Sequence, residues 1–240
     1  FYFILFTGCI APLNTFAEED EEYFMSWELQ HSGKLQLIWF YTTAKDYTIG
    51  QPNRVIADNK EFLIHPDVRP PTINGLYLLE HSKVNEGDEV LDIGTGSGIH
   101  AIFAAEKAKR VVATDIYAPA IENAKINAKL NNVDHKIDFR LGDLFEPIKD
   151  GEKFDAFFFN INYPFNDDDS ERKQLHERLF AEIREYMKPK ARIYYQVSFI
   201  RTFPYIYEML MRNHFNIMEV HMENMQSSQQ EPLFIMIQSD

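Results

Sequence analysis

The stretch VLDIGTGSGIHAIFAAE (residues 90–106) constrains the fold of this chain more than any other part of the sequence. A buried-type apolar run ends at Asp92, glycines follow at alternate positions, and apolar residues at helical spacing begin with Ile99. Similar strand-like runs follow, and the earlier ones alternate with helix-like stretches. Such alternation requires crossover connections, which produce a mostly parallel sheet covered by helices on both faces.

The chain is therefore expected to be an α/β protein with a doubly wound, seven-stranded, mostly parallel sheet and a small N-terminal β element. The predicted strands are residues 89–94, 110–116, 136–143, 154–160, 192–199, 215–222 and 233–238. The main predicted helices are residues 72–84, 99–106, a helix behind Pro119, 170–187 and 204–213. No helix separates the last two strands, so the last strand is expected to be antiparallel.

Three regions are predicted along the chain: residues 1–17, an N-terminal β-hairpin region over 18–68, and the main sheet domain over 69–240. The first region begins apolar, and its LFTGC resembles a loose bacterial lipobox with Cys9 as the lipidated residue, while TFA resembles a signal-peptidase site. An apolar strand or helix packed on the domain is the alternative. The protein is exported or membrane-anchored in the first case and cytoplasmic in the second.

Composition excludes several kinds of site. Cys9 is the single cysteine, which rules out intrachain disulfides and cysteine zinc clusters. The 8 histidines show no ligand-pair spacing, so no metal is expected, and His100 is assigned with the others to the surface or the core. A net charge of -13 disfavours a large nucleic-acid partner.

The glycine-rich loop indicates a nucleoside-containing ligand, because ligands of open α/β sheets bind at the carboxyl ends of the strands. Asp115 closes the next strand, where a carboxylate accepts hydrogen bonds from ribose hydroxyls. The glycine spacing is G-x-G-x-G and differs from the G-x-G-x-x-G of dinucleotide sites. Asp92 is unfavourable beside a pyrophosphate but suits a cationic ligand. A nicotinamide-dependent oxidoreductase is therefore the weaker alternative.

Residues 84–165 resemble the class I S-adenosylmethionine-dependent methyltransferases. The resemblance implies that the cofactor is S-adenosylmethionine, with its ammonium group near Asp92, its ribose on Asp115 and its adenine against Ile116. The segment LGDLFEP resembles the acidic adenine contact of that family, carried by Asp143 with Leu144 beside it. The complete set of implied cofactor residues is Asp92, Gly94, Thr95, Gly96, Gly98, Asp115, Ile116, Asp143, Leu144 and Asn160.

The run FDAFFFNINYPF (residues 154–165) stops abruptly on amide side chains. It resembles the strand end of one branch of the family, where Asn-Pro-Pro-Tyr or Asn-Pro-Pro-Phe follows an initial Phe-Asp, although Ile161 and Asn162 replace both prolines. The resemblance implies that the catalytic residues are Asn160, Asn162 and Tyr163, with Asn160 orienting a planar amide or amino nitrogen. NYPF in a shifted register is the alternative. The loss of both prolines is compatible with three alternatives: a less rigid loop, a different substrate or a loss of activity.

A second resemblance concerns YTIG (residues 47–50) and HPDVRPPT (residues 65–72), which are similar to the hairpin and the Arg-Pro-Glu-Thr segment of the release-factor glutamine methyltransferases. It implies that Arg69 and Thr72 lie on the substrate side, and it favours a protein amide over a nucleobase. We therefore predict an S-adenosylmethionine-dependent N-methyltransferase acting on a protein. The alternative is a catalytically weakened S-adenosylmethionine-binding module or surface lipoprotein. The oligomeric state stays open.

Overall fold

The structure is a computed structural model that describes residues 26–32, 34–161, 170–197, 202–222 and 233–239. Its strands are β1 (Ser26–Ser32), β2 (Leu35–Tyr41), β3 (Arg54–Ala57), β4 (Lys60–Leu63), β5 (Glu89–Ile93), β6 (Arg110–Asp115), β7 (Ile137–Leu141), β8 (Phe154–Phe159), β9 (Met187–Val197), β10 (Phe215–Met222) and β11 (Leu233–Ser239). Its helices are α1 (Ala44–Ile49), α2 (Ile73–His81), α3 (Ile99–Ala105), α4 (Ala118–Leu130), α5 (Ser170–Glu182) and α6 (Phe203–Arg212), with 3₁₀ turns η1 (Asp134–Lys136) and η2 (Ile183–Tyr186). Within this described part, no helix is long and apolar enough to cross a membrane.

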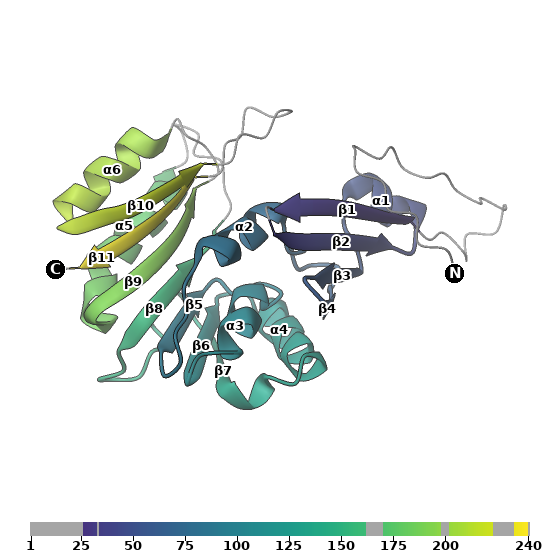
Figure 1. Cartoon of the computed structure of the whole chain (residues 1–240), viewed down its shortest axis with the longest axis horizontal. Coiled ribbons are helices and arrows are strands. Elements are labelled where there is room, and N and C mark those ends of the chain that lie inside the picture. Colours follow the sequence, from purple (N-terminus) through teal and green to yellow (C-terminus); the bar gives the residue numbers. More distant parts are fainter. Residues whose placement is uncertain (1–25, 33, 162–169, 198–201, 223–232, 240) are drawn as a thin grey trace.

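The larger sheet has seven strands in the order β10-β11-β9-β8-β5-β6-β7 (Figure 1). The strands from β9 to β7 run parallel to one another, whereas β11 is antiparallel to both β9 and β10. The predicted seven-stranded, mostly parallel sheet and its antiparallel last strand are confirmed. Strand order reverses between β5 and β8, and ligands of open α/β sheets bind at the carboxyl end of such a switch point.

Strand β8 is apolar almost throughout because both of its faces are covered. Ala156 and Phe158 pack in the cluster formed with α2, α3 and α4. Phe157 and Phe159 point to the other face and pack in the cluster formed with α5 and α6. All four side chains have an exposed fraction of 0%. The apolar run in FDAFFFN therefore reflects a central strand, and its first amide stands where the strand leaves the core.

Two expected elements differ from the structure. Residues 44–49, which include most of the YTIG segment, form helix α1 where a hairpin is predicted, and the Thr43 hydroxyl accepts a hydrogen bond from the Asp46 N–H at 3.0 Å as a helix cap. The helix predicted over 170–187 ends at Glu182, passes through η2, and gives way to β9 at Met187. Met187 pairs with Phe154 of β8, so sheet pairing ends the helical segment there.

The second sheet has the antiparallel order β1-β2-β3-β4, which leaves β4 as an edge strand facing helix α4. Two asparagines of α4 and Asn131, which caps its C-terminus, stand at four-residue intervals and form hydrogen bonds to the backbone of alternate residues along this edge. Asn131 bonds the N–H and C=O of Glu61, Asn127 bonds the N–H and C=O of Leu63, and Asn123 bonds the Leu63 C=O and the His65 N–H. We call these three side chains the asparagine ladder.

The asparagine ladder works because the repeats of the two elements nearly match. Four residues of a helix advance about 6 Å, and two residues of a strand advance about 6.6 Å. Side-chain amides, each with a donor and an acceptor, therefore take the place of a fifth strand. The unpaired backbone of an edge strand is otherwise a liability. The ladder thus attaches the small sheet to the larger domain.

Asn127 is the central member of the ladder. It is 0% exposed, and its Nδ2 also donates to the carbonyl of Ser97 at 2.9 Å. Asn127→Ala should lower the free energy of unfolding by about 2–4 kcal/mol, because it leaves the Leu63 N–H and the Ser97 carbonyl without partners. Asn131→Ala, at the half-buried end, should cost about 1 kcal/mol. Urea denaturation measures both, and equal costs would contradict the central role of Asn127.

Candidate functional site

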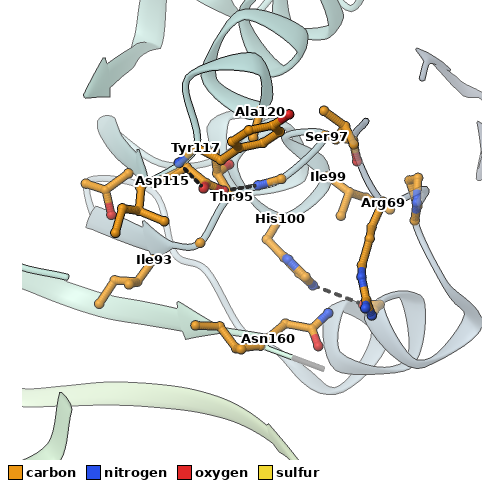
Figure 2. A pocket seen from close by; sticks show the side chains of 18 of the residues that line it. Arg69, Ile93, Thr95, Ser97, Ile99, His100, Asp115, Tyr117, Ala120 and Asn160 are labelled. Carbon is orange, nitrogen blue, oxygen red and sulfur yellow. Dashed lines mark hydrogen bonds between the residues drawn. The ribbon is translucent and has the colours of Figure 1, made fainter. Parts of the chain in front are cut away.

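A cavity of about 580 Å³ lies at the carboxyl ends of the central strands, a volume typical of a small-molecule site (Figure 2). The glycine loop and the ends of β6, β7 and β8 line it, together with residues 67–72 and parts of α2 and α3. It brings together most of the predicted site residues: Arg69, Thr72, Gly94, Thr95, Gly96, Asp115, Ile116, Asp143, Leu144 and Asn160. Asp92 and Gly98 are not among its lining residues, and Asn162 and Tyr163 lie outside the described residues.

The glycine loop turns sharply over the end of β6. The N–H groups of Gly94 and Thr95 both donate to the carbonyl of Thr114, each at 2.9 Å. Gly96 has a φ of 58°, and a Cβ built there would meet nothing within 4 Å, so its glycine serves the backbone turn and leaves the cavity open. At Gly98 a Cβ would lie 3.1 Å from the Cβ of Ala124, so glycine allows α4 to approach closely.

Asp115 holds the loop and faces the cavity at the same time. Its Oδ2 accepts a hydrogen bond from the Gly96 N–H and its Oδ1 from the Tyr117 N–H, each at 2.9 Å (Figure 2). A carboxylate has about four acceptor positions, so two remain for a ligand. Ile116, next in the chain, is 71% exposed on the cavity wall and offers an apolar platform. This arrangement suits a ribose with an attached flat ring.

The loop after β7 forms the adjoining wall. Leu144 is buried and has a φ of 43°, a left-handed conformation that bulky residues rarely adopt. Asp143 pairs with Arg178 of α5, whose Nη1 lies 2.8 Å from its Oδ2. This pairing raises the pKa of the Arg178 guanidinium. Asp143 is thus anchored at the cavity by Arg178, and its contact with adenine stays a prediction.

Asn160 stands at the end of β8, and its side chain lines the cavity. Its Oδ1 is buried and has no hydrogen-bond donor. An unpaired buried acceptor costs free energy, which a donor from a ligand would recover. On its other side, the amide lies against Gly75, where a built Cβ would be 3.1 Å from Asn160 Nδ2. The site therefore combines a nucleoside-type cleft with one unsatisfied amide oxygen.

A sequence model of the methyltransferase small domain matches residues 74–227, which is more than half of the chain. The chain belongs to this methyltransferase family. A Methanocaldococcus jannaschii protein with the provisional name protein N5-glutamine methyltransferase is 34% identical over 140 residues, covering 52% of this chain and 69% of that one. The release factor glutamine methyltransferase of Aliivibrio fischeri is 29% identical over 157 residues, covering 61% of this chain and 55% of that one. This chain thus spans about half the length of the latter relative.

The crystal structure of the ribosomal protein L11 methylase from Lactobacillus delbrueckii subsp. bulgaricus has a similar fold, with a TM-score of 0.57 and 24% identity. The alignment covers 72% of this chain and 82% of that one. At this identity the likeness shows the fold alone. Together these matches confirm the class I methyltransferase fold and the resemblance to the glutamine methyltransferase branch. They give no support to the oxidoreductase alternative.

In this methyltransferase, Asp92 lies behind the glycine loop, with an exposed fraction of 1%. Its Oδ2 accepts hydrogen bonds from the Thr95 hydroxyl at 2.7 Å and from the Ala101 N–H at 3.1 Å. Burial raises the pKa of the Asp92 carboxyl to about 7, against the two hydrogen bonds and with the help of the nearby Asp115 charge. Asp92 thus ties the loop to α3, and its place near a cofactor ammonium stays a prediction.

Among the lining residues of the methyltransferase site that were not predicted, two lie near Asn160. His100, in the first turn of α3, lines the cavity although the sequence assigned it to the surface or the core. Gly75, in the first turn of α2, lines the same wall. The position of His100 directly after the glycine loop is a signal that could have identified it. Nothing comparable marks Gly75, because its role depends on the approach of another element.

The raised pKa of Asp92 gives a pH dependence with a definite sign. The folded protein binds the proton more tightly than the unfolded chain, so stability falls as pH rises from about 4 to about 7 and then levels off. Asp92→Asn keeps an oxygen acceptor and removes this titration. The unfolding free energy of Asp92→Asn relative to the parent should therefore rise with pH across this window, by up to about 4 kcal/mol. Denaturation at several pH values measures it, and a constant difference would contradict the buried, protonated state.

Proposed function

We propose that this chain is an S-adenosylmethionine-dependent N-methyltransferase that methylates a planar nitrogen of a protein, with a glutamine side-chain amide as the first candidate. The observation that carries the proposal is the Asn160 side chain, which lines the cavity and whose buried Oδ1 has no hydrogen-bond donor. An amide oxygen in this position accepts a hydrogen bond from an N–H group, and a primary amide carries such a group on the nitrogen to be methylated.

The substrate class is also supported by the relatives and the charge. Two similar proteins carry names that specify glutamine methylation. The net charge of -13 gives no general attraction to the phosphate backbone of a nucleic acid. A protein acceptor is therefore favoured over RNA.

Three features of the cavity suit the proposed cofactor. Gly96 leaves open space, Asp115 keeps free acceptor positions for a ribose, and Ile116 provides an apolar platform. S-adenosylmethionine would supply a methyl group on a positively charged sulfur, which becomes a neutral thioether after transfer. Near the loop, the Asp92 carboxyl would favour a cationic neighbour, because a positive charge stabilises its ionised form.

The residues of the chain are proposed to act by alignment. Asn160 would accept a hydrogen bond from the acceptor nitrogen and direct the nitrogen lone pair toward the methyl group. The nitrogen–carbon bond would form as the carbon–sulfur bond breaks, and the displaced proton would leave to solvent. Positioning of this kind accounts for large rate accelerations without an acid–base pair. The predicted partners Asn162 and Tyr163 belong to the same proposal.

Asp115→Ala should weaken binding of S-adenosylhomocysteine about ten- to a hundredfold, because charge-assisted hydrogen bonds contribute roughly 1.5–3 kcal/mol. Part of this loss would come from the glycine loop, whose Gly96 N–H depends on the same carboxylate. Asp115→Asn retains one oxygen and should lose less. Isothermal titration calorimetry on variants with parental melting curves measures both. Unchanged affinity in Asp115→Ala would show that the carboxylate serves the loop alone.

The function is tested by incubating the purified chain with tritiated S-adenosylmethionine and a purified bacterial release factor, with total tRNA as a separate acceptor. Label in the protein, located by mass spectrometry on a glutamine nitrogen, is the expected result. Label in RNA alone would contradict the proposed substrate class.

Asn160→Ala should reduce the methyl-transfer rate by about a hundredfold or more while leaving S-adenosylhomocysteine affinity nearly unchanged, because a lost alignment contact acts in the transition state. Asn74→Ala is the matched control. Its Oδ1 is likewise buried without a donor, but it does not line the cavity. Rapid-quench measurement of a single turnover separates the rate from binding. Equal rates in the two variants would refute the role of Asn160.

A further inference from the structure

Three elements meet at the amide of Asn160: the end of β8, the first turn of α2 and the first turn of α3. Figure 2 shows His100 and Asn160 directed toward the same part of the cavity, beside the start of α2. Gly75 lies between them, since a Cβ built on it would be 3.1 Å from Asn160 Nδ2 and 3.6 Å from His100 Nε2. A Cβ at position 75 would thus press on the Asn160 amide and lie in ordinary van der Waals contact with His100.

His100 is held rigidly in this position. It is 4% exposed, and its ring stacks on Phe158 with centroids 5.5 Å apart and an angle of 18° between the planes. Phe158 in turn stacks on Tyr194, at 5.2 Å. Nε2 of His100 donates to the Gly75 carbonyl at 3.3 Å, because a carbonyl can only accept. Burial lowers the pKa of His100 to about 4, so the imidazole is neutral at physiological pH.

The backbone directly after Asn160 has no proline to restrain it, because Ile161 takes the next position. Ile161 contacts the glycine loop, where a Cβ on Gly94 would lie 3.4 Å from its Cγ1. Gly75, in the first turn of α2, lies close to the Asn160 Nδ2, which a Cβ on this glycine would approach to 3.1 Å. Packing from α2 therefore supplies the restraint on this side of the amide.

We propose that His100 and Gly75 are positioning residues for methyl transfer: His100 holds the first turn of α2 by its hydrogen bond to Gly75, and Gly75 lets that turn lie against Asn160 and fix the plane of its amide. The inference rests on the proposed function, in which Asn160 aligns the acceptor nitrogen. It adds the first turn of α2 to the elements that form the acceptor site. None of the motifs that predicted the site in the sequence lies in this helix.

Gly75→Ala is the most direct test, because it should disturb the acceptor site without disturbing the fold. The φ of Gly75 is not positive, and alanine favours a helix more than glycine does, so α2 should be retained. The added methyl group should push the Asn160 amide from its position. We expect the rate of methyl transfer to the release factor to fall about 10- to 100-fold at saturating concentrations, with S-adenosylhomocysteine affinity within about twofold of the parent.

A second test compares the two variants His100→Phe and His100→Gln. Phenylalanine keeps the stack on Phe158 but loses the donor to Gly75, whereas glutamine offers an N–H in its place. The transfer rate should fall in His100→Phe and recover in His100→Gln. His176→Phe is the matched control, since His176 is also buried, contacts Phe159 edge-on and does not line the cavity. It should lower stability without changing the rate.

The side-chain amide signals of Asn160 in a ¹⁵N correlation spectrum, assigned by their loss in Asn160→Asp, give a readout that needs no substrate. They should shift in Gly75→Ala and His100→Phe and stay near the parental position in His100→Gln and His176→Phe. Parental signals and rates in both Gly75→Ala and His100→Phe would overturn the inference, as would equal losses of rate and cofactor affinity. A parent that methylates nothing would refute the proposed function, and the amide signals would still decide the positioning role.

Discussion

The buried amide of Asn127 is the contact on which the arrangement of this site depends. Its Nδ2 bonds the Ser97 carbonyl of the glycine loop and the Leu63 carbonyl of β4, and its Oδ1 accepts from the Leu63 N–H. One side chain thus joins the glycine loop, helix α4 and the small N-terminal sheet. The chain continues from β4 into residues 67–72, which line the cavity. The asparagine ladder therefore sets where this segment lies.

Further hydrogen bonds place the same segment over the cavity. Trp39 of β2 donates from Nε1 to the Pro71 carbonyl at 3.0 Å, and Gln51 donates to the Val68 carbonyl at 2.9 Å. Thr72 then caps α2 by accepting from the Gly75 N–H at 3.3 Å. The small sheet, the Pro-rich segment and the first turn of α2 form one continuous support, which ends at the Asn160 amide. A change in the N-terminal sheet can thereby reach the proposed acceptor site through packed contacts.

Much of the fold could be predicted because its signals are local. The strand, the glycine loop and the helix of residues 90–106 follow from hydrophobic periodicity and glycine spacing, and the Asp115 position follows from the next strand end. The helix boundary at Glu182 could not be predicted, because pairing of Met187 with Phe154 joins residues far apart in the chain. Helix α1 was missed although Thr43 and Asp46 have the spacing of a capping motif, so that signal was present and was not used.

The sequence by itself determined the class of the protein: an α/β methyltransferase fold with Asp115 and Asn160 at the carboxyl ends of two parallel strands, since both follow from motifs that are contiguous along the chain. Only the tertiary structure decided which groups surround those residues. Asp92 turned out to lie behind the loop, and Gly75 and His100 to lie at the Asn160 amide. The reason is physical: burial and an unpaired oxygen are properties of the space between elements, and that space exists only once the helices have packed on the sheet.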